Sequence, residues 1–198
     1  MLQRLTVLYR LKSLAFSVLE VLGGALLLAV GGRCVIKTPF TPVPFTLQTM
    51  FLAILVLLLR RRAWRPVACY IALGLLGLPV FAFGGGLWYL SSPTFGYILG
   101  FLVAAIIVGR IVRRLELKWL IVYAITVNLI VYLLGVPWLA CWLALTSGAP
   151  IATAAYKALV LGLLPFIGWD LLKAIGAALC SWTIYALHPL QAWFKQSY

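Results

Sequence analysis

Two ionisable residues, Asp170 and Lys173, stand three positions apart in an apolar stretch near the end of the chain. Positions i and i+3 of a helix are neighbours on one face, so a carboxylate and an ammonium would lie side by side. Ionisable groups are costly in hydrocarbon and by default mark a functional site. A structural ion pair is the alternative. As a tight pair, the two groups suit ligand binding better than acid–base catalysis.

A run of three glycines, Gly84, Gly85 and Gly86, precedes the aromatic residues Trp88 and Tyr97. Successive glycines let backbone N–H groups approach an anion closely, and aromatic rings supply flat apolar walls with a polar tip. The alternative is a turn beside an interfacial aromatic belt. Together with an Asp–Lys pair, this segment would suit a small ligand with an apolar body, N–H donors and a carboxylate.

The segment 37–49 carries prolines at positions 39, 42 and 44. Proline fixes φ and removes an N–H donor, which predicts a stiff non-helical connector. Gln48, near Thr46 and Thr49, adds a hydrogen-bonding group where a helix should begin, and helix capping is the alternative use. Asn128 is an isolated polar residue in a later apolar stretch, where it would bind a ligand or only a neighbouring helix.

The elements that must position these residues are expected to lie in a membrane. Of the 198 residues, 65% are hydrophobic and 10% are charged, whereas a soluble domain has about 25% charged residues. The net charge is +13, but the basic residues lie between apolar runs. This placement is typical of cytoplasmic loops of a membrane protein and disfavours nucleic-acid binding.

Six apolar stretches predict an all-α fold, a polytopic membrane protein with six transmembrane helices in one bundle, the whole chain (residues 1–198) forming a single integral-membrane domain. We expect the spans at residues 14–36, 45–59, 67–81, 97–112, 119–145 and 169–187. Gly135 and Pro137 predict a bend or a break in the fifth span. With both termini in the cytoplasm, most Lys and Arg residues fall on the cytoplasmic side, which favours that orientation.

Several chemistries have no support in the sequence. The four cysteines, at positions 34, 69, 141 and 180, form no CxxC pair, so we expect no metal site and no disulfide framework. The spans hold no nucleophile–base pair, and the chain has no P-loop motif. We therefore expect no catalytic residues, no cofactor and no ATPase site.

Three stretches resemble the BioY family, the biotin-binding S-components (substrate-binding subunits) of energy-coupling factor (ECF) vitamin transporters. They are FTPVPFTLQT at 40–49, GLPVFAFGGGLWYLSSPTFGYILGF at 77–101 and PFIGWDLLKA at 165–174, in the order and at about the spacing of the family. One departure is the loop before the fourth span, which in the family reads close to GPTGGY. Here Ser92 and Phe95 replace two glycines, which makes the rim bulkier.

The resemblance implies residue roles in biotin capture from the outer side of the membrane. Asp170 would accept hydrogen bonds from the ureido N–H groups, and Lys173 would donate to a ureido or carboxylate oxygen. The glycine run 84–86 would hold the carboxylate, while Trp88 and Tyr97 would wall the rings and the chain of the ligand.

The resemblance also implies weaker site candidates and protein partners. Gln48 and Asn128 would add hydrogen bonds to the ligand. The partners would be a membrane coupling protein and a pair of cytoplasmic ATPases, in the cytoplasmic membrane of a bacterium. Ala25 and Ala29 would let the first span contact the coupling protein closely, or would pack within the chain. An S-component for another small vitamin and a stand-alone vitamin carrier are the alternative functions.

Overall fold

The computed structural model describes the backbone of residues 2–187 and the side chains of residues 13–187. Within this part, the chain is all-helical, as predicted. The α-helices are α1 (Leu2–Arg33), α2 (Gln48–Leu59), α3 (Trp64–Leu75), α4 (Phe95–Ile111), α5 (Leu117–Ser147), α6 (Ile151–Gly162) and α7 (Ile167–Leu187). Two short 3-10 helices, η1 (Arg60–Arg62) and η2 (Leu87–Ser91), complete the set.

Six of these helices correspond to the six expected spans, and α6 is an additional helix of 12 residues. Among the described residues, three helical stretches are long and apolar enough to cross a membrane: Ser13–Arg33, Leu117–Ser147 and Ile167–Leu187. The helices α2 and α3 have only 12 residues each, or roughly 18 Å at 1.5 Å per residue. They are shorter than the hydrocarbon core, so neighbouring segments must cover their ends.

Two helix ends fall earlier than the sequence predicts. The first span was expected to reach residue 36, but α1 ends at Arg33 and Ile36 pairs with Phe45 in an isolated antiparallel bridge. The third was expected to reach residue 81, but α3 ends at Leu75. Gly77 adopts a φ of 104°, a conformation that ends a helix and favours glycine.

The helix α5 continues without a break past Gly135 and Pro137, from Leu117 to Ser147. The expected break therefore does not occur. A Cβ atom at Gly135 would overlap with the ring of Tyr97 in α4, and one at Gly100 would lie 2.8 Å from the Cα of Val131 in α5. These glycines serve close packing between α4 and α5, as small residues commonly do between membrane helices.

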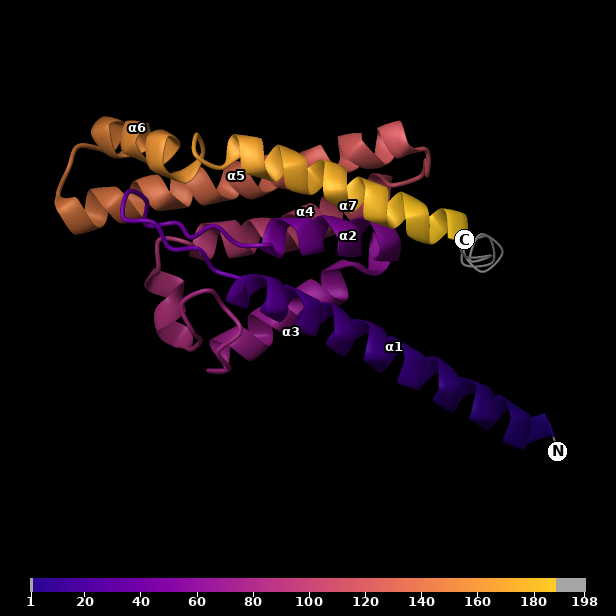
Figure 1. The fold of residues 1–198 in the computed structure, drawn as a ribbon. Helices are drawn as coiled ribbons and strands as arrows, with labels where there is room; N and C mark the ends of the chain where they lie inside the picture. Colours follow the sequence, from indigo (N-terminus) through magenta and orange to yellow (C-terminus); the bar gives the residue numbers. More distant parts are fainter. Residues whose placement is uncertain (1, 188–198) are drawn as a thin grey trace.

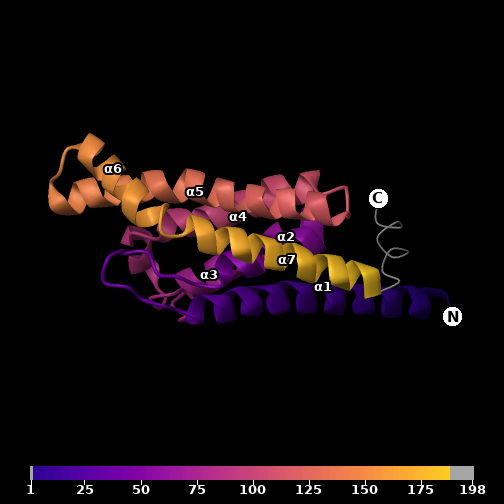
Figure 2. The ribbon, with the colours of Figure 1, turned by 45° about the horizontal axis from the view of Figure 1, so that its top comes forward.

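The segments singled out from the sequence meet at one end of the bundle. The connector 34–47, the loop 76–94 and the turn between α5 and α6 lie at the left in Figure 1, opposite the start of α1 and the end of α7. The view in Figure 2 agrees, and it places η1 and the loop 112–116 toward the other end. Helices α2, α4, α5 and α7 pack together, while α1 packs on α3 and α2.

The small residues of α1 face the inside of the chain. Ala25 and Ala29 are 3% and 9% exposed, and a Cβ atom at the neighbouring Gly24 would lie 2.6 Å from the Cβ of Pro66 in α3. Packing within the chain, one of the two alternatives, therefore accounts for these alanines in this conformation. The face of α1 that stays open carries leucines, among them Leu19 and Leu26.

Candidate ligand-binding site

A pocket lies at the end of the bundle where the loops meet. The connector, the loop 76–94 and the helices α2, α4, α5 and α7 all contribute to its lining, with Gly162 at the end of α6 and Phe166 after it. The polar lining residues are Thr46, Gln48, Thr49, Tyr89, Thr94, Tyr97, Tyr132, Asp170 and Lys173. The cavity measures ≈ 60 Å³, which holds a few water molecules. A vitamin-sized ligand needs the surrounding segments to move apart.

The carboxylate of Asp170 is the centre of a buried polar network. Asp170 is 5% exposed and lies in the first turn of α7. Its Oδ1 accepts a hydrogen bond from the Thr49 hydroxyl (3.0 Å) and forms an ion pair with Lys173, while its Oδ2 accepts from the Tyr132 hydroxyl. We call Asp170, Lys173, Thr49, Tyr132 and Asn128 the Asp170 network. It joins α2, α5 and α7 around a charge that burial would otherwise make costly.

Lys173 connects this network to the connector. Its ammonium donates a hydrogen bond to the backbone oxygen of Thr46 (2.9 Å) as well as pairing with Asp170. The side chain is only 13% exposed. An ammonium has three N–H donors, so after these two partners within the described chain one donor is left for a ligand oxygen.

Asn128 touches Asp170 but does not line the pocket. Its side-chain N–H group donates to the backbone oxygen of Asp170 (3.0 Å). Its side-chain oxygen is buried and has no hydrogen-bond partner among the described residues. In this conformation Asn128 positions the first turn of α7, and its contact with a ligand stays a prediction.

Gln48 lines the pocket, yet its amide points into a second network. The side-chain N–H group donates to the Tyr70 hydroxyl of α3 (2.5 Å) and lies 3.5 Å from the backbone oxygen of Leu28 in α1. The Tyr70 hydroxyl in turn donates to the backbone oxygen of Val80 (3.4 Å). We call these four residues the Gln48 network. It is neutral and ties α1, α2 and α3 together.

Tyr97 is a wall of the pocket, as its predicted role requires. Its hydroxyl donates to the backbone oxygen of Gly162 (2.9 Å), and its ring meets that of Tyr132 edge-on at 6.5 Å. Phe166, another lining residue, stacks on Phe45 of the connector with ring centroids 4.3 Å apart. Aromatic side chains therefore line the pocket together with Asp170.

The glycine run lies outside the pocket lining. The N–H group of Gly84 donates to the oxygen of Phe81 (3.1 Å), and that of Gly86 donates to the oxygen of Gly74 at the end of α3 (2.7 Å). Both glycines have positive φ values, 121° and 112°. In this conformation the run serves a tight turn packed on α3, and two of its three N–H groups are already engaged.

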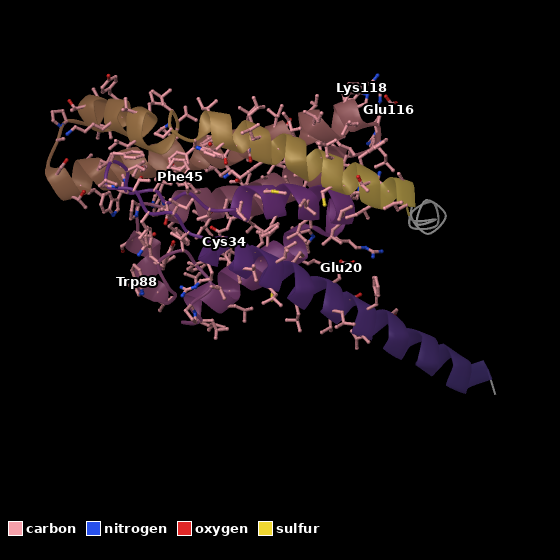
Figure 3. All side chains as sticks on the ribbon, viewed as in Figure 1. Glu20, Cys34, Phe45, Trp88, Glu116 and Lys118 are labelled. Carbon is pink, nitrogen blue, oxygen red and sulfur yellow. The ribbon has the colours of Figure 1, made fainter. Side chains whose placement is uncertain are left out.

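Trp88 also lies outside the pocket lining. Its side chain is 57% exposed, and its indole N–H donates to the oxygen of Gly85 (2.7 Å). Figure 3 shows Trp88 on the outer surface of the loop.

The neighbouring Tyr89 is the aromatic residue of this loop that reaches the pocket. Burial raises the pKa of the Tyr89 phenol, and the hydroxyl accepts a hydrogen bond from Thr94 (3.0 Å).

The family model described as "BioY family" matches residues 6–189. This chain belongs to the BioY family. It is a multi-pass membrane protein of a transporter family, not a member of an enzyme family. The resemblance found from the three stretches is thereby confirmed.

Individual relatives agree with the family assignment. The "Probable biotin transporter BioY" of Lysinibacillus sphaericus is 38% identical over 165 residues, covering 81% of this chain and 82% of the relative. The "Biotin transporter BioY" of Thermotoga maritima is 36% identical over 147 residues, or 73% and 82%. A crystal structure described as the S-component for biotin from an ECF-type ABC transporter superposes with a TM-score of 0.69 at 25% identity, covering 94% of this chain and 97% of the other.

Two residues of this BioY-family site, Thr49 and Tyr132, were not singled out as site residues from the sequence. Both donate to the Asp170 carboxylate. Thr49 ends the first of the three BioY-like stretches, and Tyr132 stands four positions after Asn128, on the same face of α5. These signals were available, but a threonine and a tyrosine in apolar spans have many ordinary uses.

Proposed function

We propose that this chain captures biotin with high affinity at the outer face of the bacterial cytoplasmic membrane and is the substrate-binding subunit of an ATP-driven ECF transporter. The observation that carries the proposal is the buried Asp170 carboxylate, which faces a pocket and has Lys173 beside it. Membership of the BioY family and the names of the relatives support biotin as the ligand.

The chemistry of the Asp170 network suits the ureido group of biotin. This group presents two N–H donors beside one carbonyl acceptor. The Asp170 carboxylate accepts from both N–H groups, which take the free lone pair of Oδ2 and the place of the Thr49 hydroxyl on Oδ1, while Tyr132 stays bound. Lys173 donates its remaining N–H to the carbonyl oxygen. A site built to satisfy such groups rejects analogues that lack them, because its own buried polar groups are then left unpaired.

The apolar part of the pocket suits the rest of the ligand. Tyr97, Phe166 and the connector residues Val43 and Pro44 line the cavity beside Asp170, and they offer hydrocarbon and aromatic surface to a ring and a methylene chain. The predicted roles of Trp88 and of the run 84–86 need a different loop conformation, since both lie outside the lining.

The partners we propose are a membrane coupling protein and a pair of cytoplasmic ATPases. The sequence has no P-loop motif, so the energy for uptake comes from another subunit. We place both termini in the cytoplasm, because the basic residues of η1 and of the loop 112–116 lie at the end of the bundle where α1 begins. The coupling protein meets the open leucine face of α1, or reaches Ala25 and Ala29 after α1 moves.

Equilibrium binding of labelled biotin to the purified, detergent-solubilised protein tests the proposal. Saturable binding is expected, weakened in both Asp170→Ala and Lys173→Ala and resistant to competition by other vitamins. Glu116→Ala is the matched control, because it removes an exposed acid at the opposite end of the molecule (Figure 3). Wild-type affinity in Asp170→Ala would remove the assigned role, and displacement by another vitamin would favour the S-component alternative.

Uptake in cells distinguishes the transporter subunit from the stand-alone carrier. Biotin uptake is measured in cells that produce this chain with and without the ATPase pair. We expect uptake to depend on the ATPases. Equal uptake without them would support a carrier that works alone.

A further inference from the structure

In this conformation the glycine run 84–86, which the sequence predicts to hold the carboxylate of the ligand, does not line the pocket. The N–H groups of Gly84 and Gly86 donate to backbone oxygens, and the run lies outside the pocket lining. Lys173 is engaged with Asp170 and Thr46 deeper in the site. An anionic tail therefore needs another cation or donor at the mouth of the pocket.

The backbone of the connector places Lys37 beside the pocket. Ile36 and Phe45 exchange two hydrogen bonds, from the N–H of Ile36 to the oxygen of Phe45 (2.9 Å) and in the reverse direction (3.0 Å). In this antiparallel register the residue opposite Lys37 is Pro44, and Pro44 lines the pocket. The connector thus carries Lys37 to the rim by main-chain pairing.

The side chain of Lys37 reaches the other side of the rim. Its ammonium lies over the ring of Phe83, 5.4 Å from the centroid, and the residue before Phe83, Ala82, lines the pocket. Lys37 is exposed, and among the described residues it forms no ion pair with an acid. A cation–π contact at an exposed site is weak, so an anion can take its place.

The connector has contacts with both cations. Lys173 holds Thr46, and Lys37 stands opposite Pro44, two residues away. Two residues of extended chain span at most ~7 Å, and the flexible side chain of Lys37 extends beyond its backbone, so the two ammonium groups can reach a ureido oxygen and a carboxylate at opposite ends of biotin. The deep polar group and the cation at the mouth can therefore hold the two ends of one molecule.

We propose that the Lys37 ammonium binds the ionised carboxylate of biotin at the mouth of the pocket, an inference that rests on the function proposed above. Lys37 is then a specificity-determining residue. It distinguishes the free acid from neutral derivatives with the same rings, whereas Asp170 and Lys173 bind the ureido group that both kinds of ligand share.

Binding of two ligands to the purified full chain tests this role. The ligands are biotin and biotinamide, which replaces the carboxylate by an uncharged group of nearly the same shape. Lys37→Gln should weaken biotin binding by about fivefold, the value of an exposed charge pair, and leave biotinamide binding unchanged. Lys37→Arg should keep the preference for biotin. Lys157→Gln, which removes an exposed cation of α6 outside the pocket lining, should change neither affinity.

The outcomes separate this inference from the proposed function. If Lys37→Gln weakens both ligands equally, Lys37 supports the rim and does not bind the carboxylate; if it weakens neither, the subsite is elsewhere. Either result overturns the inference and leaves biotin capture intact. A folded wild-type protein that binds neither ligand would overturn the proposed function and this inference with it. Thermal unfolding of each variant verifies that it is folded.

Discussion

The Asp170 network and the Gln48 network begin at adjacent residues of α2 and differ in what they can do. Thr49 turns toward Asp170 in α7, while Gln48 turns toward Tyr70 in α3. The first network contains a full ion pair, whereas the second is neutral and its hydrogen bonds end on the backbone oxygens of Leu28 and Val80. A buried polar cluster can bind a ligand where one of its charges faces a cavity. Where its hydrogen bonds are satisfied within the chain, the cluster instead links helices and contributes to stability.

The largest expected effect on biotin binding comes from removing the charge of Asp170 while keeping the shape of its side chain. Asp170→Asn keeps the size of the side chain but removes the charged acceptor of two ureido hydrogen bonds. Each such bond contributes about 1.5–3 kcal/mol, so biotin binding should weaken more than about 100-fold. Titration calorimetry measures the change. An affinity within tenfold of the wild type would show that the negative charge of Asp170 is not required for tight biotin binding.

A substitution in the Gln48 network should lower the stability of the protein and leave its affinity for biotin nearly unchanged. Gln48→Leu removes the donor to Tyr70 and leaves buried acceptors unpaired, which should lower the free energy of unfolding by about 1–3 kcal/mol. Biotin affinity of the folded protein should stay within threefold. Thermal unfolding and calorimetry on the same sample measure both. A large loss of affinity at unchanged stability would instead place Gln48 in contact with the ligand, as the sequence suggested.

Two tyrosines of one pocket give a finer comparison. Tyr132 donates to the Asp170 carboxylate, while Tyr97 donates to the backbone of Gly162. Tyr132→Phe should weaken biotin binding by about fivefold, because one hydrogen bond that orients the carboxylate is lost. Tyr97→Phe is the matched control, with a smaller effect on binding. The reverse order of the two effects would contradict the assigned centre of the site.

The sequence predicts the architecture well because apolar runs of about 20 residues have few other uses. It misses α6, because its 12 residues are mainly apolar but too few to be taken as a membrane span. It also predicts a bend or a break at Gly135 and Pro137, whereas α5 continues without a break. The packing of α4 against α5 that accompanies the continuous helix depends on contacts between residues distant in the sequence, so local sequence does not reveal it.

For the site, the sequence finds the ionisable pair and misses its supporting groups. Asp170 and Lys173 stand out because charges are rare in apolar spans. Gln48 and Thr49 look equivalent in the sequence, yet successive helix residues point about 100° apart, so only the tertiary arrangement decides which of them faces Asp170. The glycine run 84–86 has the composition of an anion site, but its position against Gly74 turns two N–H groups to the backbone.

The close packing of α4 on α5 has a consequence for motion. A side chain at Gly96 or Gly100 would overlap with α5, so these helices touch through their backbones and form one rigid wall of the cavity. This wall cannot yield when a ligand arrives, and the widening falls to the connector 34–47 on the other side. In hydrogen–deuterium exchange, we expect the amides of α4 and α5 to exchange only with global unfolding, and those of the connector to exchange far sooner, until a ligand slows them.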